Sequence, residues 1–220
     1  LTNAPGLHAR FKLDREGETI AIYDAARRRV DAVSFGFQSP GFALGRFGSS
    51  GAWGLAKPTP GAANASAETA PSTGLKINEW LANPPPGSDD WLELFNPDLA
   101  RPATLDRLLL ATESALFQIQ SLTFVPPQGF VRLFADERAG ASRVGFKLAS
   151  KGGFIALLDS EGSEINRVTY ALQAEGISEG RLSDGGSDIG PLPSGPTPGA
   201  SNSLPVAPRD TDGDGLPDEW

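Results

Sequence analysis

The sequence contains no cysteine and no methionine, and its only histidine is His8. The absence of cysteine excludes disulfides, thiolate catalysis and cysteine-ligated zinc. His8 lies near the beginning of the chain, outside the complete unit that we expect at residues 75–203. A serine or threonine triad within that unit therefore lacks its usual base, and a histidine-based zinc site there is excluded as well. The sequence therefore offers no catalytic residues that we can assign.

Long apolar runs and an excess of basic residues are also missing. No segment approaches the roughly 18 apolar residues that a membrane span requires. The formal net charge is −8, and the basic residues are dispersed apart from the triplet at 27–29, which we interpret as a solvated hairpin tip. Nucleic-acid binding, which needs a basic face, is not expected. The chain begins at Leu1 without a leader, so we expect a fragment or a processed product, which leaves secretion open.

Glycine and proline are abundant, with 26 and 19 residues among 220, and they favour short strands separated by turns over long helices. No run of helical period extends beyond about two turns. Short apolar or alternating runs predict strands at 75–81, 91–96, 105–111, 130–135, 153–159 and 165–171. The last two should form a hairpin. Strands this short and this frequent predict an all-β fold, a β-sandwich.

An internal repeat organises the chain. With an offset of 135 residues (146 − 11), 12 of the 36 positions from 11 to 46 are identical to those from 146 to 181. The second copy then contains an insertion of three residues. Beyond it, Thr-Pro-Gly-Ala at 59–62 matches the same four residues at 197–200. Each copy ends with an asparagine, Asn64 or Asn202. Self-similarity at a fixed offset indicates a repeated structural unit.

The second copy is preceded by residues 75–145, whereas only ten residues precede the first copy. We therefore expect a complete unit at 75–203 and the back half of a second such unit at 1–63. The small, polar residues 64–74 have the composition of a linker. The truncated half should expose apolar edges, and should be less ordered than the complete unit or lean on it. Residues 204–220 form a second linker and an acidic end.

Six motifs in the complete unit resemble the lamin tail domain. They are L-K-I-N-E-W-L-A-N-P, D-D-W-L-E-L-F-N-P, V-P-P-Q-G-F-V-R-L-F, G-G-F-I-A-L-L-D, G-R-L-S-D-G and P-T-P-G-A-S-N, in this order along residues 75–203. The resemblance implies an immunoglobulin-like β-sandwich without catalytic residues. Bacterial members of this family are typically appended to secreted or surface proteins, often beside hydrolases or adhesion modules.

The resemblance thus implies a non-catalytic structural or interaction module of a secreted or cell-surface bacterial multidomain protein. Two alternatives stay open: an accessory module of an extracellular hydrolase whose catalytic domain lies elsewhere, and a carbohydrate-binding module. The partner would then be a protein or a glycan, and the sequence does not indicate an oligomeric state. Trp53, Trp80, Trp91 and the terminal Trp220 are candidates for an aromatic platform, although we expect two of the first three to fill the core.

Two glutamates lie among apolar strand residues, Glu79 between Ile77 and Leu81, and Glu93 between Trp91 and Phe95. One interpretation is a ligand-facing or catalytic carboxylate. The other, which we favour, is a half-exposed strand glutamate paired with an arginine, and we expect one of the two to meet Arg181.

The chain ends in an acidic stretch with the spacing of a calcium loop. Asp210, Asp212 and Asp214 occupy positions 1, 3 and 5, and Asp218 occupies position 9. Calcium takes six to eight oxygen ligands, and Leu216 could add a backbone carbonyl. The stretch resembles thrombospondin type 3 repeats of secreted proteins. The ligand expected at position 12 would follow Trp220, so we expect Ca²⁺ in the intact parent protein and weak or absent binding here.

Overall fold

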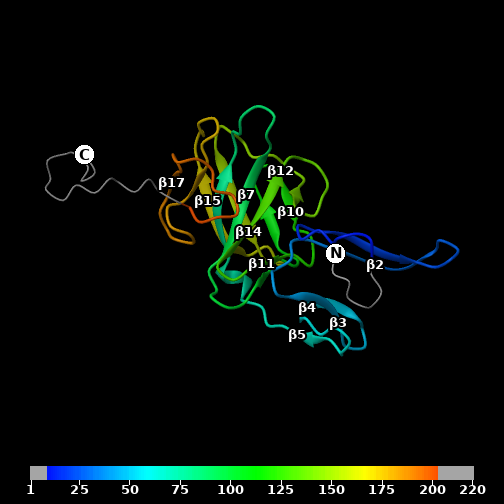
Figure 1. The fold of residues 1–220 in the computed structure, drawn as a ribbon. Coiled ribbons are helices and arrows are strands. Elements are labelled where there is room, and N and C mark those ends of the chain that lie inside the picture. The colour runs from blue at the N-terminus through cyan, green and yellow to red at the C-terminus, as the bar shows by residue number, and fades with distance from the viewer. Residues whose placement is uncertain (1–8, 203–220) are drawn as a thin grey trace, which may run out of the picture.

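The structure is a computed structural model that describes residues 9–202. It is an all-β fold, as predicted, and across this range the one helical element is a 3-10 turn at Ser72–Gly74. Figure 1 shows a main body of strands, coloured green to orange, with the smaller β1–β2 and β3–β5 elements beside it. Among the described residues, no helix is long and apolar enough to cross a membrane.

The larger sheet of the main body has six strands in the order β13-β12-β7-β6-β16-β17. Its strands are β6 (Lys76–Leu81), β7 (Asp90–Asn96), β12 (Gly129–Ala135), β13 (Arg143–Val144), β16 (Glu179–Arg181) and β17 (Ile189–Pro191). All neighbours are antiparallel except β12 and β13. Strands from the beginning and the end of the unit therefore meet in the middle of this sheet, where β6 pairs with β16.

The second sheet has four strands in the order β10-β9-β14-β15. Its strands are β9 (Leu109–Ala111), β10 (Leu116–Gln118), β14 (Gly153–Leu158) and β15 (Glu164–Tyr170). The predicted final hairpin is β14–β15. Of the strand predicted at 105–111 only the end is formed, because Leu105 and Leu108 instead close a turn through a backbone hydrogen bond. A small third pair joins β8 (Ala103–Thr104) to β11 (Phe124–Val125).

One hydrophobic core joins the two main sheets and makes the body a β-sandwich. Leu92 and Leu94 contribute from the six-stranded sheet, and Leu110, Ile155 and Leu157 from the four-stranded sheet, and all five are fully buried. Alternate residues of a strand point to opposite faces, so Leu92 and Leu94 enter the core while Glu93 points away from it. Burial of this apolar surface is the main stabilising contribution.

The first copy of the repeat forms the same elements as the second. β1 (Glu18–Tyr23) and β2 (Arg29–Phe35) correspond residue for residue, at the offset of 135, to β14 and β15. Both hairpins have their register shift at the equivalent place, after Ile22 and after Leu157. The basic triplet lies at the tip of β1–β2 and is exposed, as predicted. Similar sequence therefore gives the same local structure in both copies.

The rest of the first copy is a second small sheet of β3 (Ala43–Phe47), β4 (Ala52–Lys57) and β5 (Ala65–Ser66). Its connection to β1–β2 lies against the main sandwich: the Phe124 amide donates to the Phe37 carbonyl, and Gln38 Nε2 donates to the Leu122 carbonyl. Phe37 also packs against the main core. The described part of the first copy thus leans on the complete unit, and its residues form no separate core cluster.

The segment predicted as a linker, 64–74, contains ordered contacts. β5 extends the small sheet, and Ala70 is buried, where its amide donates to the Pro102 carbonyl. Ala70 also forms a parallel bridge with Ala103. Small side chains let the backbone approach the sandwich closely, so the segment predicted as a linker also packs against it.

Candidate functional site

The two glutamates singled out in the sequence lie directly opposite each other. Glu79 on β6 and Glu93 on β7 are paired in the register, and both are fully buried. The prediction that they are half-exposed is wrong. Both point to the outer face of the six-stranded sheet, and a later segment of the chain covers that face.

The covering segment, which we call the clasp, comprises residues 197–202. The Thr197 amide and hydroxyl each donate to one oxygen of Glu79, both at 2.9 Å. The Gly199 amide donates to Glu93 Oε2 at 2.5 Å. Asn202 closes the end of the clasp, since its side-chain amide donates to the carbonyls of Asn78 and Arg181. The clasp therefore joins the last residues of the unit to its first two strands.

The predicted pairing of Arg181 with a glutamate is also wrong. Arg181 is buried, and its guanidinium donates to the carbonyls of Ile77 and Gly186 and to Asn166 Oδ1. Among the ion pairs of residues 9–202 none joins Arg181 to Glu79 or Glu93. Burial lowers the pKa of Arg181 from its usual value. The arginine thus bonds backbone and amide oxygens, and the glutamates are bonded by the clasp.

Burial governs the protonation of Glu93. The pKa of Glu93 is raised to about 8: loss of solvation is the largest cause, the hydrogen bond from the Gly199 amide opposes it, and the negative charges of Glu79 and Asp184 add to it. At neutral pH most Glu93 side chains in the folded protein are consequently protonated. A carboxyl with a raised pKa is a common sign of a catalytic acid, but this carboxyl is covered by the clasp. In this arrangement it bonds the clasp and is not accessible to a substrate.

The tryptophans divide between core and surface. Trp80 is fully buried against Tyr170, with ring centroids 5.9 Å apart, and Trp91 is 5% exposed. The expectation that two of the three fill the core holds for Trp80 alone, because Trp91 is buried on the same face of β7 as Glu93 and does not belong to the core. Trp53 is partly exposed on β4, and its ring lies 4.7 Å from the guanidinium carbon of Arg46.

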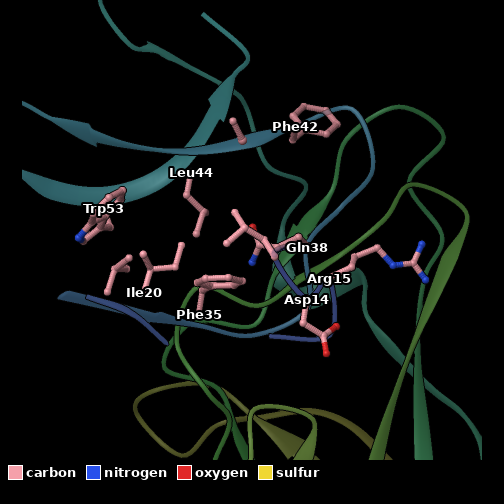
Figure 2. Close-up of a pocket in the computed structure, with 11 residues that line it drawn as sticks. Asp14, Arg15, Ile20, Phe35, Gln38, Phe42, Leu44 and Trp53 are labelled. Carbon is pink, nitrogen blue, oxygen red and sulfur yellow. The ribbon is translucent and has the colours of Figure 1, made fainter. Parts of the chain in front are cut away.

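A groove of about 490 Å³ lies between the two small sheets of the first copy. Figure 2 shows Leu44 and Trp53 pointing from β3 and β4 toward Ile20 and Phe35 on β1 and β2. The polar side chains that line the groove, Asp14, Arg15 and Gln38, lie at one of its ends. The walls are predominantly apolar, so the groove suits an apolar or aromatic occupant.

The predicted calcium ligands Asp210, Asp212, Asp214, Leu216 and Asp218 lie outside the described residues. Within residues 9–202, no group of three or more acidic or histidine side chains is placed to hold a metal ion. The calcium site therefore stays a prediction from the sequence.

The clasp was not predicted from the sequence, although a signal for it was present. Thr197 and Asn202 belong to the motif that ends each copy of the repeat, Thr-Pro-Gly-Ala followed by asparagine. A motif repeated at the end of each unit indicates a shared structural contact. Comparison of the chain with protein-family models, with curated proteins and with solved structures gave no match in any of the three.

Proposed function

We propose that the chain is a non-catalytic structural or interaction module, with an immunoglobulin-like sandwich of the lamin tail type, from a secreted or cell-surface multidomain protein. The observation that carries the proposal is the use of the buried polar groups. Glu79, Glu93 and Arg181 are buried side chains that could serve chemistry, and each is hydrogen-bonded within the protein, Glu93 through Oε2 while its Oε1 is buried without a partner among the described residues. Their role is to hold the first and last strands together.

The positions of the motifs support the same proposal. The two glutamate-bearing motifs form adjacent strands, and the final motif forms the clasp that bonds them. The residues that carry the resemblance thus make contacts with one another. The acidic stretch at 210–218 adds the proposal of an extracellular, calcium-rich setting, because free calcium is high enough there to occupy modest sites.

Two alternatives have distinct requirements. A role as an accessory module of an extracellular hydrolase is compatible with the same fold, since the catalytic domain would lie elsewhere in the parent protein. A carbohydrate-binding role needs an exposed aromatic ring, and Trp53 in the groove is the described tryptophan that meets this requirement. Glycan-array binding that is lost in Trp53→Ala would favour the carbohydrate role.

The experiment that tests the main proposal separates stability from turnover. The full chain and its Glu79→Gln and Glu93→Gln variants are assayed with glycoside, ester, phosphoester and peptide substrates, and their unfolding is followed in parallel. A structural module gives no turnover in any of the three proteins, and each substitution changes the unfolding midpoint. Turnover by the wild-type chain that disappears in a variant whose unfolding midpoint is unchanged would refute the proposal.

A further inference from the structure

Equivalent apolar side chains have different environments in the two copies of the repeat. Phe146 and Leu148 are each 5% exposed and belong to the main core, whereas their counterparts Phe11 and Leu13 are 67% and 57% exposed. Ile22 is 61% exposed where its counterpart Leu157 is fully buried. The first copy therefore retains core residues whose covering elements, in the complete unit, come from residues 75–145.

The strand edges differ in the same way. In the complete unit β16 pairs with β6, with Gly180 opposite Glu79, and β14 pairs with β9. β3 corresponds to β16 and β1 to β14. Within the described part of the chain, β3 has β4 as its one strand neighbour and β1 has β2. Across residues 9–202 each of these strands thus presents an open edge, which is a template for pairing with another strand.

The counterparts of the clasp residues, and of the arginine beside the clasp, make equivalent hydrogen bonds in the first copy. Asn64 donates to the Arg46 carbonyl as Asn202 donates to that of Arg181. Arg46 bonds Asp31, the counterpart of Asn166, which Arg181 bonds. The turn at 59–62 closes with the same 3.0 Å backbone bond as the turn at 197–200. Among the hydrogen bonds of residues 9–202, none engages the Thr59 amide or hydroxyl, whose counterparts bond Glu79.

We propose that the first copy is an acceptor for a glutamate-bearing strand pair of the kind found at residues 75–96. One strand of the occupant pairs with the open edge of β3, as β6 pairs with β16. Its glutamate accepts from the amide and hydroxyl of Thr59, and its apolar side chains fill the groove between the two small sheets. This inference rests on the internal repeat and is independent of the module's overall function.

A glycine supports this mode of binding. A Cβ on Gly180 would lie 2.7 Å from the Asn78 carbonyl oxygen, so the close approach of β6 requires glycine there. The equivalent residue on β3 is Gly45, whose added Cβ would meet Asn64 at 3.0 Å and Ala56 at 3.2 Å, both within the first copy. The first copy thus retains the residue that a closely paired strand needs.

The test uses a fluorescently labelled peptide with the sequence of residues 75–96, added to the full chain and followed by anisotropy. We expect one-to-one binding, together with hydrogen-exchange protection of the Leu44 and Arg46 amides, the counterparts of the Glu179 and Arg181 amides on the β16 edge that pairs with β6. The Thr59→Val variant should bind the peptide roughly tenfold more weakly, because a hydrogen bond to a charged group is lost. A peptide in which alanine replaces the residue corresponding to Glu79 should show a similar loss.

Thr197→Val is the matched control, since it removes the same hydroxyl from the complete unit and should leave peptide binding unchanged. A second arm places a copy of residues 75–145 ahead of residue 9, where burial of Phe11 and Leu13 is followed by hydroxyl-radical footprinting. Absence both of peptide binding up to about 1 mM and of protection in the second arm would overturn the proposal. Binding that Thr59→Val leaves unchanged, or a dimer of the chain that covers the groove and that the peptide does not displace, would also overturn it.

Discussion

Glu79 and Glu93 are opposite each other on neighbouring strands, and neither carboxyl is exposed to solvent. Like charges directly opposite each other destabilise a sheet, and burial increases the penalty because the charges lose hydration. Three donors from the clasp and a proton on Glu93 resolve the conflict. The pair thus makes the sandwich depend on the last residues of its own unit.

The first prediction is that stability falls as pH rises from about 4.5 to about 8. The pKa of Glu93 is about 8 in the folded protein and near 4.5 when unfolded, so the folded state binds more protons in this window. Its contribution is complete below the unfolded pKa and is lost as pH rises through the folded pKa. Glu93→Gln should reduce the loss by roughly 2–4 kcal/mol. Urea unfolding of both proteins at pH 5, 7 and 9 measures how the free energy of unfolding depends on pH.

Asp90 and Glu179 also have raised pKa values, mainly through burial, and they add a dependence of the same sign. Glu93→Gln should therefore flatten the profile without abolishing it. A profile for Glu93→Gln that parallels the wild-type profile would show that Glu93 is charged in the folded protein at neutral pH.

The second prediction compares the two asparagines that end the repeats. Asn202 is buried and bonds two backbone carbonyls, so Asn202→Ala leaves both without a donor and should lower the free energy of unfolding by roughly 2–4 kcal/mol. Asn64 is exposed, and the one hydrogen bond of its side chain among residues 9–202 goes to the Arg46 carbonyl, so Asn64→Ala should change the free energy of unfolding by less than about 0.5 kcal/mol. Equal effects of the two substitutions in chemical denaturation would contradict the assignment of the clasp.

Much of the sandwich could be predicted from the sequence because its strands alternate. The leucines at 92 and 94 and the glutamate between them showed which residues share a face. Alternation cannot show what covers the outer face, since the clasp comes from over 100 residues further along the chain. The pairing of Arg181 with a glutamate was wrong for this reason. Opposite charge suggested the partner, whereas the register placed the arginine beside the Ile77 carbonyl.

The third prediction concerns the phenylalanines of Phe-Lys-Leu, a tripeptide that both copies of the repeat contain, at 11–13 and at 146–148. Phe146→Ala removes a core ring that lies edge-on to Phe117 at 6.4 Å, and should lower the free energy of unfolding by roughly 3–5 kcal/mol. Phe11→Ala removes an exposed ring and should have an effect below about 0.5 kcal/mol. Guanidinium unfolding of both variants measures the difference. A large loss for Phe11→Ala would show that this ring is buried in solution, and would contradict an open first copy.

The fourth prediction concerns calcium at the acidic end. The predicted ligands are four aspartates, Asp210, Asp212, Asp214 and Asp218, and the Leu216 carbonyl; with one oxygen from each they provide five, fewer than the six to eight that calcium takes. We expect weak binding by this chain in isothermal titration, and binding at least roughly tenfold tighter when a glutamate is added at position 12 of the loop. Asp212→Asn in the extended chain should remove most of the gain, because it replaces a charged ligand by a neutral one. Asp188→Asn, which changes an exposed carboxylate elsewhere, is the control and should leave the titration unchanged. If extension does not tighten binding, the acidic stretch is not a calcium loop.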